Sequence, residues 1–66
     1  MRVKINDTET VFTGETLFEL IKSQGLANRT GLAVAVNEIV ISRAEWQFHA
    51  LKEGDEILII VPAQGG

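Results

Sequence analysis

The sequence has 66 residues, enough for one small domain that buries only about 60% of the surface its unfolded chain exposes. It contains no cysteine, which excludes disulfide bonds, thiol nucleophiles and cysteine-bound metal or iron–sulfur sites. Nine acidic and six basic residues give a formal net charge of −3, which disfavours nucleic-acid binding and favours a protein partner with a basic surface.

The start of the sequence predicts a β-hairpin. Residues 1–6 alternate apolar with polar side chains, the period-two pattern of a strand with one buried face. Asn6-Asp7 is a turn-forming pair, and the β-branched and aromatic residues over 8–13 predict a second strand that ends at Gly14. The alternation differs from the apolar run of a signal peptide, and no apolar stretch approaches the ~20 residues of a membrane span, so we expect a cytoplasmic protein without membrane contact.

A helix is expected next, from about Leu17 to Gln24. Thr16 and Glu19 have the spacing of a capping box, in which each side chain accepts a hydrogen bond from a free amide at the helix start. Gly25 stands where a helix commonly ends in the left-handed conformation. The apolar stripe that would cover a sheet consists of Leu17, Leu20 and Ile21.

The middle of the sequence predicts a loop over 26–31 and a strand over 32–36. This strand is apolar at both parities, as expected where little solvent reaches either face. Asn37-Glu38 then turns the chain into a short strand over 39–41.

A second capping box is expected at Ser42 and Glu45, starting one or two helical turns that carry Trp46. Residues 52–55 follow as a polar turn. The run over 57–61 is the most apolar of the chain and predicts a strand, beginning at Glu56, at the centre of its sheet.

Pro62 cannot continue a strand, so we expect a body over residues 1–62 and a flexible C-terminal Gly-Gly tail over 63–66. The order of elements is a hairpin, a helix, a strand, short connections and a central strand. It predicts an α+β fold of the β-grasp type, a mixed sheet with one main helix packed across it.

Alternate residues of the last strand point to opposite faces of the sheet. Ile57 and Ile59 should face the helix, whereas Leu58 and Ile60 should lie on the outer face of the sheet, beside Arg2 and Lys4 of the first strand. Exposed apolar side chains often mark a partner surface, so Leu58 and Ile60 are the predicted partner-binding face. The alternative is that loops or another chain cover them.

Other candidate sites are weaker. His49 lacks a second histidine or a carboxylate pair, so it is interpreted as a loop residue and not as a metal ligand or base. Trp46 and Phe48 are interpreted as core side chains and not as a base-stacking platform. The acidic residues Glu53, Asp55 and Glu56 are read as a solvated turn and not as a metal site, and the scattered glycines form no phosphate loop.

The whole chain resembles the ThiS family of sulfur carriers, which have a ubiquitin-like β-grasp fold. The residues that carry the resemblance are Asn37, Arg43, Trp46, Leu51, Gly54-Asp55 and Gly65-Gly66. Two positions depart from the family pattern: Ser42 stands where proline is common, and Ala63-Gln64 stand where a bulkier apolar residue is frequent.

The resemblance implies a carrier and not an enzyme, with no cofactor of its own. A ThiF-like adenylating enzyme would use ATP to activate the carboxylate of Gly66, and a persulfide sulfur donor would convert it to a thiocarboxylate. A ThiG-like thiazole synthase would then receive the sulfur for thiamine biosynthesis. Ala63, Gln64 and Gly65 would be the residues by which a partner recognises the tail.

The residue types suit this chemistry. A C-terminal carboxylate has a pKa near 3.3–3.7 and is therefore a ready nucleophile at pH 7. Glycine presents no side chain to the walls of a narrow active-site slot, and its unsubstituted α-carbon leaves the carbonyl open to attack. Three alternatives stay open: a MoaD-like sulfur carrier for molybdopterin, a ubiquitin-like protein modifier and a plain interaction module with an inert tail.

Overall fold

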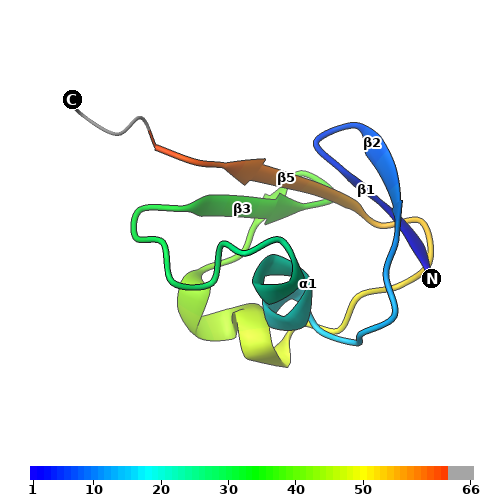
Figure 1. The fold of residues 1–66 in the computed structure, drawn as a ribbon, viewed down its shortest axis with the longest axis horizontal. Coiled ribbons are helices and arrows are strands. Elements are labelled where there is room, and N and C mark those ends of the chain that lie inside the picture. The colour runs from blue at the N-terminus through cyan, green and yellow to red at the C-terminus, as the bar shows by residue number, and fades with distance from the viewer. Residues whose placement is uncertain (63–66) are drawn as a thin grey trace.

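The structure is a computed structural model that describes residues 1–62, and in this part of the chain a five-stranded sheet packs against α1 (Figure 1). The elements in chain order are β1 (Arg2–Ile5), β2 (Thr8–Val11), α1 (Leu17–Ser23), β3 (Ala33–Val36), β4 (Ile39–Val40), the 3₁₀-helix η1 (Arg43–Phe48) and β5 (Glu56–Ile60). The strand order is β2-β1-β5-β3-β4, so the last strand is central, as predicted. β1 and β5 are parallel and the other pairs are antiparallel, which confirms the predicted mixed α+β sheet.

Two hairpins rest on the same kind of turn. Asn6 and Asp7 have φ angles of 49° and 67°, and Asn37 and Glu38 have φ angles of 49° and 72°. Two consecutive positive φ angles define the type I′ turn, whose twist suits adjoining antiparallel strands. Asparagine opens both turns because it enters this region at lower cost than most residues.

The second strand is shorter than expected, ending at Val11 instead of near Gly14. Phe12 beyond it is buried in the core. A Cβ atom on Gly14 would lie 2.5 Å from Cζ of the Phe12 ring, so only glycine lets the backbone approach so closely. The glycine marks this close approach and not the end of a strand.

The predicted capping box at the start of α1 is confirmed. Thr16 Oγ1 accepts a hydrogen bond from the Glu19 amide at 3.2 Å, and Glu19 Oε1 accepts one from the Thr16 amide at 3.0 Å. Gln24 caps the other end, and Gly25 beyond it has φ 74°, as expected for a left-handed helix terminus.

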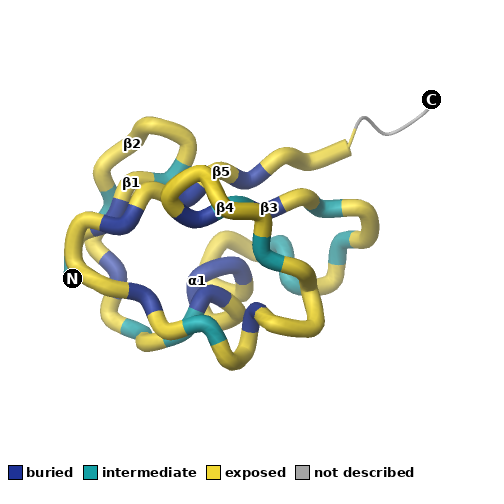
Figure 2. Tube along the Cα trace, turned by 180° about the vertical axis from the view of Figure 1, so that it is seen from behind, coloured by how far each residue is buried: buried dark blue, intermediate teal, exposed yellow. Residues whose placement is uncertain are grey.

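The core lies between α1 and the inner face of the sheet. Every second residue of β5 faces it, and buried segments alternate with exposed ones along the chain trace (Figure 2). The buried apolar residues are Val3, Phe12, Leu17, Leu20, Ile21, Val34, Val36, Trp46, Leu51, Ile57 and Ile59. β3 was expected to be covered on both faces, but Ala33 on its outer face is exposed. β3 is therefore buried on its inner face and open to solvent at Ala33 on its outer face.

The second helix differs from its prediction. η1 is a 3₁₀-helix, and the Ser42 side chain makes no capping hydrogen bond. The Glu45 amide, which a capping box would give to the Ser42 hydroxyl, donates instead to the Ser42 carbonyl at 2.9 Å. This is the i→i+3 bond of a 3₁₀-turn, and it leaves the hydroxyl without its expected donor. No helix in the described part of the chain has the length and hydrophobicity to cross a membrane.

Candidate functional site

The predicted reacting residue, Gly66, lies outside the described residues, as do the predicted recognition residues Ala63, Gln64 and Gly65. The site can therefore be built from the part of the body that precedes them. β5 ends at Ile60, and Pro62 is the last residue that the structure describes. Two features adjoin this point: the outer face of the sheet, and the loop before β3.

The structure places Leu58 and Ile60 on the outer face of the sheet, with exposed fractions of 50% and 54%. Ile57 and Ile59 are buried at 3% and 6%, so the predicted division of β5 into two faces is confirmed. The role of the exposed pair in partner binding remains a prediction.

The expected neighbours of this pair are found only in part: Lys4 lines a hollow together with Leu58, whereas Arg2 does not. The parallel register sets Lys4 opposite Glu56, so the residues of β5 beyond it run past the charged positions of β1. On the other side, Ala35 lies opposite Leu58 and Ala33 lies opposite Ile60. The exposed apolar side chains therefore adjoin uncharged residues on the β3 side.

An apolar hollow of about 90 Å³ lies between these strands. It is lined by alanine side chains of β3 and by larger apolar side chains of β4 and β5. We call this surface the outer-face patch; it consists of Ala33, Ala35, Val40, Leu58 and Ile60. Val40 is 75% exposed, so the patch can receive an apolar side chain of a partner.

Charged residues border one end of the outer-face patch. A neighbouring hollow of about 270 Å³ is lined in part by Lys4, Asp7, Glu38 and Glu56. Three carboxylates against one ammonium group make this border acidic, and a basic partner surface would complement it.

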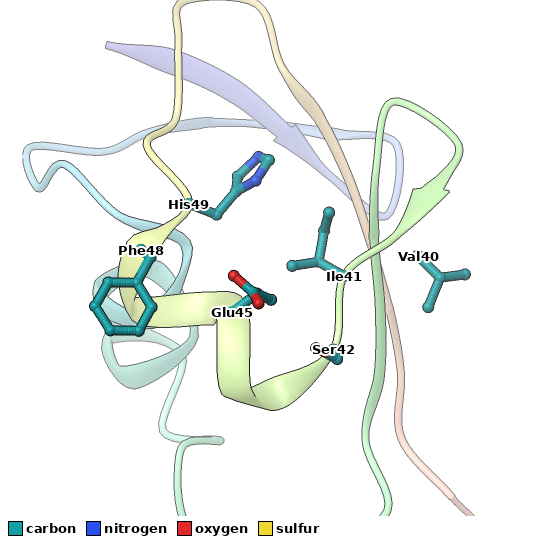
Figure 3. Close-up of a pocket in the computed structure, with 6 residues that line it drawn as sticks. All are labelled: Val40, Ile41, Ser42, Glu45, Phe48 and His49. Carbon is teal, nitrogen blue, oxygen red and sulfur yellow. The ribbon is translucent and has the colours of Figure 1, made fainter.

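A third hollow lies between β4 and η1, with a volume of about 350 Å³. Figure 3 shows the side chains that line it: Val40, Ile41, Ser42, Glu45, Phe48 and His49. A serine, a histidine and a glutamate line this hollow, but in the described structure no hydrogen bond joins any two of their side chains. A nucleophile must contact its base, and the base its orienting group, so this hollow lacks the geometry of a catalytic triad.

Phe48 corrects a further prediction, because it is 73% exposed and not part of the core. A 3₁₀-helix has three residues per turn, so Trp46, at 1% exposed, and Phe48 point in different directions. Within residues 1–62, no three His, Cys, Asp or Glu side chains form a group that could hold a metal ion.

Two of the residues that carried the family resemblance, Arg43 and Trp46, join separate parts of the body. Arg43 Nη1 donates a hydrogen bond to the Ala27 carbonyl at 3.0 Å, and Nη2 donates to the Arg29 carbonyl. Its guanidinium group also lies 4.5 Å from the ring centroid of Trp46, whose Nε1 donates to the Ile41 carbonyl at 3.0 Å. η1 is thus fastened to the loop before β3.

Asp55 was expected in a solvated turn but is only 5% exposed. Its Oδ1 accepts a hydrogen bond from Asn37 Nδ2 at 2.9 Å, and its Oδ2 accepts one from the Lys52 amide at 2.8 Å. Asn37 Oδ1 in turn accepts from the Glu56 amide at 3.0 Å. Asp55 thus joins the turn before β5 to the turn after β3.

Sequence reasoning missed the second role of Asn6. Its Oδ1 accepts a hydrogen bond from the Ile59 amide at 2.8 Å, and its Nδ2 donates to the Ile59 carbonyl at 3.1 Å. The side chain therefore continues the pairing of β1 with β5 past the end of β1. No signal in the sequence showed this, since turn formation alone accounts for an asparagine there.

Comparisons with known proteins agree with this architecture. The sequence profile of the ThiS family matches residues 3–66. The sulfur carrier protein ThiS of Escherichia coli K12 is 32% identical over 53 residues, which cover 80% of this chain and 79% of the relative.

Two solved structures from Geobacter metallireducens also match. A crystal structure of the thiamine biosynthesis protein ThiS has a TM-score of 0.82 at 22% identity, with both chains fully covered. A solution structure of a thiamine biosynthesis protein has a TM-score of 0.82 at 25% identity and covers all of this chain and 88% of the other. The fold is thus the ubiquitin-like β-grasp, and the profile match across nearly the whole sequence shows that this chain belongs to the ThiS family.

Proposed function

We propose that this protein is a sulfur carrier of thiamine biosynthesis, whose cargo is bound at the carboxylate of Gly66. The observation that carries the proposal is the family match over residues 3–66, because the matched region includes Gly65 and Gly66. The E. coli relative, matched over 80% of this chain, is itself named a sulfur carrier protein.

The proposed chemistry begins with an ATP-dependent adenylating enzyme. A carboxylate oxygen of Gly66 attacks the α-phosphorus of ATP, and pyrophosphate leaves as the acyl adenylate forms. The terminal sulfur of a persulfide donor then attacks the acyl carbon, and AMP leaves. A thiol finally cleaves the sulfur–sulfur bond of the acyl disulfide, so that a disulfide remains on the donor side and a thiocarboxylate on Gly66.

The carrier's own residues supply the nucleophile and the docking surface. The carboxylate is ionised at pH 7 and needs no base from this chain. The enzyme holds ATP, and a thiazole synthase receives the sulfur in the next step. We place these reactions in the cytoplasm, where ATP is available.

The outer-face patch is the proposed contact with these partners. It is apolar, bordered by carboxylates, and lies on β5, the strand that leads to Pro62 and residues 63–66. A partner that covers Leu58 and Ile60 would therefore have its active site within reach of the end of the chain. Four extended residues span about 13 Å, which sets the depth of the active-site slot.

The test is a reconstitution with ATP, magnesium, the cognate adenylating enzyme and a persulfide donor, followed by mass spectrometry. The intact chain should gain the mass difference between sulfur and oxygen, and fragmentation should place the change at Gly66. A chain amidated at Gly66 is the control, because it lacks the carboxylate but is otherwise unchanged. Sulfur gain by the amidated chain, or conjugates of Gly66 with protein lysines in place of a thiocarboxylate, would contradict the proposal.

A further inference from the structure

A contact between Gly31 and Pro62 lies where the chain leaves the sheet. Gly31 has φ 78°, and a Cβ atom built on it would lie 3.1 Å from Cγ of the Pro62 ring. The same Cβ would be 3.8 Å and 4.0 Å from the Cβ and Cδ atoms of that ring. The proline ring therefore lies close to Gly31, and a side chain at position 31 would make a tight contact that displaces the ring slightly.

The loop that contains Gly31 is fastened to the body on two sides. Arg43 of η1 donates hydrogen bonds to the carbonyls of Ala27 and Arg29, and its guanidinium group stacks on the buried Trp46. On the other side, the Leu26 amide donates to a carbonyl of α1 at 3.1 Å. A loop held in this way presents Gly31 to Pro62 from a fixed position.

Pro62 is suited to transmit that position along the chain. Its ring restricts φ to about −65°, and without an amide hydrogen it cannot pair in a strand. Its orientation depends on β5 before it and on what its ring contacts. In the described structure that contact includes Gly31.

We propose that Gly31 and Pro62 form a seat that sets the direction in which residues 63–66 leave the sheet toward a partner's active site. The inference rests on the proposed function, since it requires the outer-face patch and Gly66 to engage the same enzyme. Two contacts on one partner reinforce each other only when the link between them spans the correct distance and direction. A direction error at Pro62 of about 10° would move the end of four extended residues by about 2 Å. Misplacement by about 1 Å can cost about 100-fold in rate.

The chain offers a matched pair of variants. Gly31→Asn places a side chain against Pro62, while Gly25→Asn places the same side chain at φ 74°, where no atom lies within 4 Å of the added Cβ. Asparagine tolerates the left-handed region, so the backbone cost is similar and small in both variants. Any difference between them therefore reports the contact with Pro62.

The measurement is the rate of pyrophosphate release from ATP with the cognate adenylating enzyme, resolved into kcat and KM, together with the thermal midpoint of each variant. Gly31→Asn should lower kcat/KM by about tenfold or more, chiefly through kcat. Gly25→Asn should stay within about twofold of the unmodified chain. The two thermal midpoints should agree, because the pair differs at the seat and not in the core.

A double variant tests the mechanism. In a Pro62→Ala background the ring is absent, so adding Gly31→Asn should change kcat/KM by less than about twofold. A tenfold loss of kcat/KM on adding Gly31→Asn to the Pro62→Ala variant would show that position 31 does not act through the proline ring, and would overturn the proposed seat. Equal rates for Gly31→Asn and Gly25→Asn, with an active unmodified chain, would overturn it while leaving the proposed function intact. An unmodified chain that releases no pyrophosphate and gains no sulfur would overturn both.

Discussion

Glu19 illustrates how one side chain serves the start of a helix. Its Oε1 accepts hydrogen bonds from the amides of Glu15 at 3.1 Å and Thr16 at 3.0 Å, and from the Thr16 hydroxyl at 3.2 Å. The bond from the Glu15 amide, then that from the Thr16 amide, lowers the pKa of the Glu19 carboxyl, since both favour the charged form.

This shift predicts a pH dependence. Because the pKa of Glu19 is lower in the folded chain than in the unfolded chain, its contribution to stability is fully present above the ordinary glutamate pKa of about 4.3. The contribution is lost as the pH falls through the lowered pKa of the folded chain. NMR titration should show Glu19 protonating below the ordinary glutamate pKa of about 4.3.

Glu19→Gln provides the control for that titration. The amide keeps an acceptor oxygen but cannot ionise, so unfolding of this variant should depend less on pH in the acid range. A Glu19 carboxyl that titrates at or above the ordinary glutamate pKa of about 4.3 would contradict the interpretation of the cap.

Some residues could be placed from the sequence and others could not. Trp46 was correctly predicted to be buried, because a large apolar side chain in a small domain has few other places. The burial of Asp55 was not predicted, because the sequence shows a carboxylate in a polar turn but does not show which groups donate hydrogen bonds to it. One of these donors is Nδ2 of Asn37, which is 18 residues away in the sequence. A hydrogen bond between side chains so far apart leaves no local pattern in the sequence.

At the scale of elements, the two helices begin with similar motifs but different hydrogen bonds. Thr16 Oγ1 accepts from the Glu19 amide, whereas the Ser42 side chain accepts from no amide of η1. The motif spacing is therefore sufficient only where the first turn is α-helical.

This contrast predicts unequal effects of two alanine substitutions. Thr16→Ala should lower the free energy of unfolding by about 1 kcal/mol, the usual cost of a lost N-cap. Ser42→Ala should change it by less than about 0.5 kcal/mol, since no capping bond is removed. Urea denaturation of both variants measures the difference, and equal losses would show that η1 is capped in solution.

The two faces of β5 predict another contrast. Leu58→Asp should fold, because its side chain is half exposed, and should weaken binding of the adenylating enzyme if the outer-face patch is the docking surface. Ile59→Asp should fail to fold, because it places an unpaired charge in the core. Circular dichroism and a binding titration measure the two properties.

Val11→Asp is the matched control for this pair. Val11 is 72% exposed but lies on β2, at the edge of the sheet opposite β4. The variant should fold and bind normally. Equal loss of binding in Val11→Asp and Leu58→Asp would show that added charge, and not the position of the patch, weakens the complex.

At the scale of the whole molecule, the architecture could be predicted because each element carried its own signal. The alternation over 1–6, the cap at Thr16 and the apolar run over 57–61 each indicated one element, and their order allowed few topologies. The register could not be predicted in the same way. A shift of β5 along β1 by two residues would keep the same side chains on each face, and so Arg2 was wrongly expected beside Leu58 and Ile60.

The division of the chain into a body and a tail predicts that Gly65 and Gly66 contribute little to stability. They have no side chains to bury, and the apolar core is already formed by residues between Val3 and Ile59. Deleting both should shift the thermal midpoint by less than about 7 °C, the change expected for a loss of about 1 kcal/mol in a domain of this size. The same deletion should abolish sulfur loading, and a large fall in the midpoint would show that the glycines pack against the body.

The parallel pairing of β1 with β5 has a consequence for synthesis of the protein. Translation delivers β1 first and β5 last, so the strand at the centre of the sheet reaches its partners only when nearly the whole sequence has been made. A nascent chain that stops short of Glu56 lacks Ile57 and Ile59 and exposes the core that they would cover. Such a fragment is a substrate for cellular proteases. Degradation would thus remove truncated carriers, which lack a terminal glycine to load, before they could occupy an enzyme.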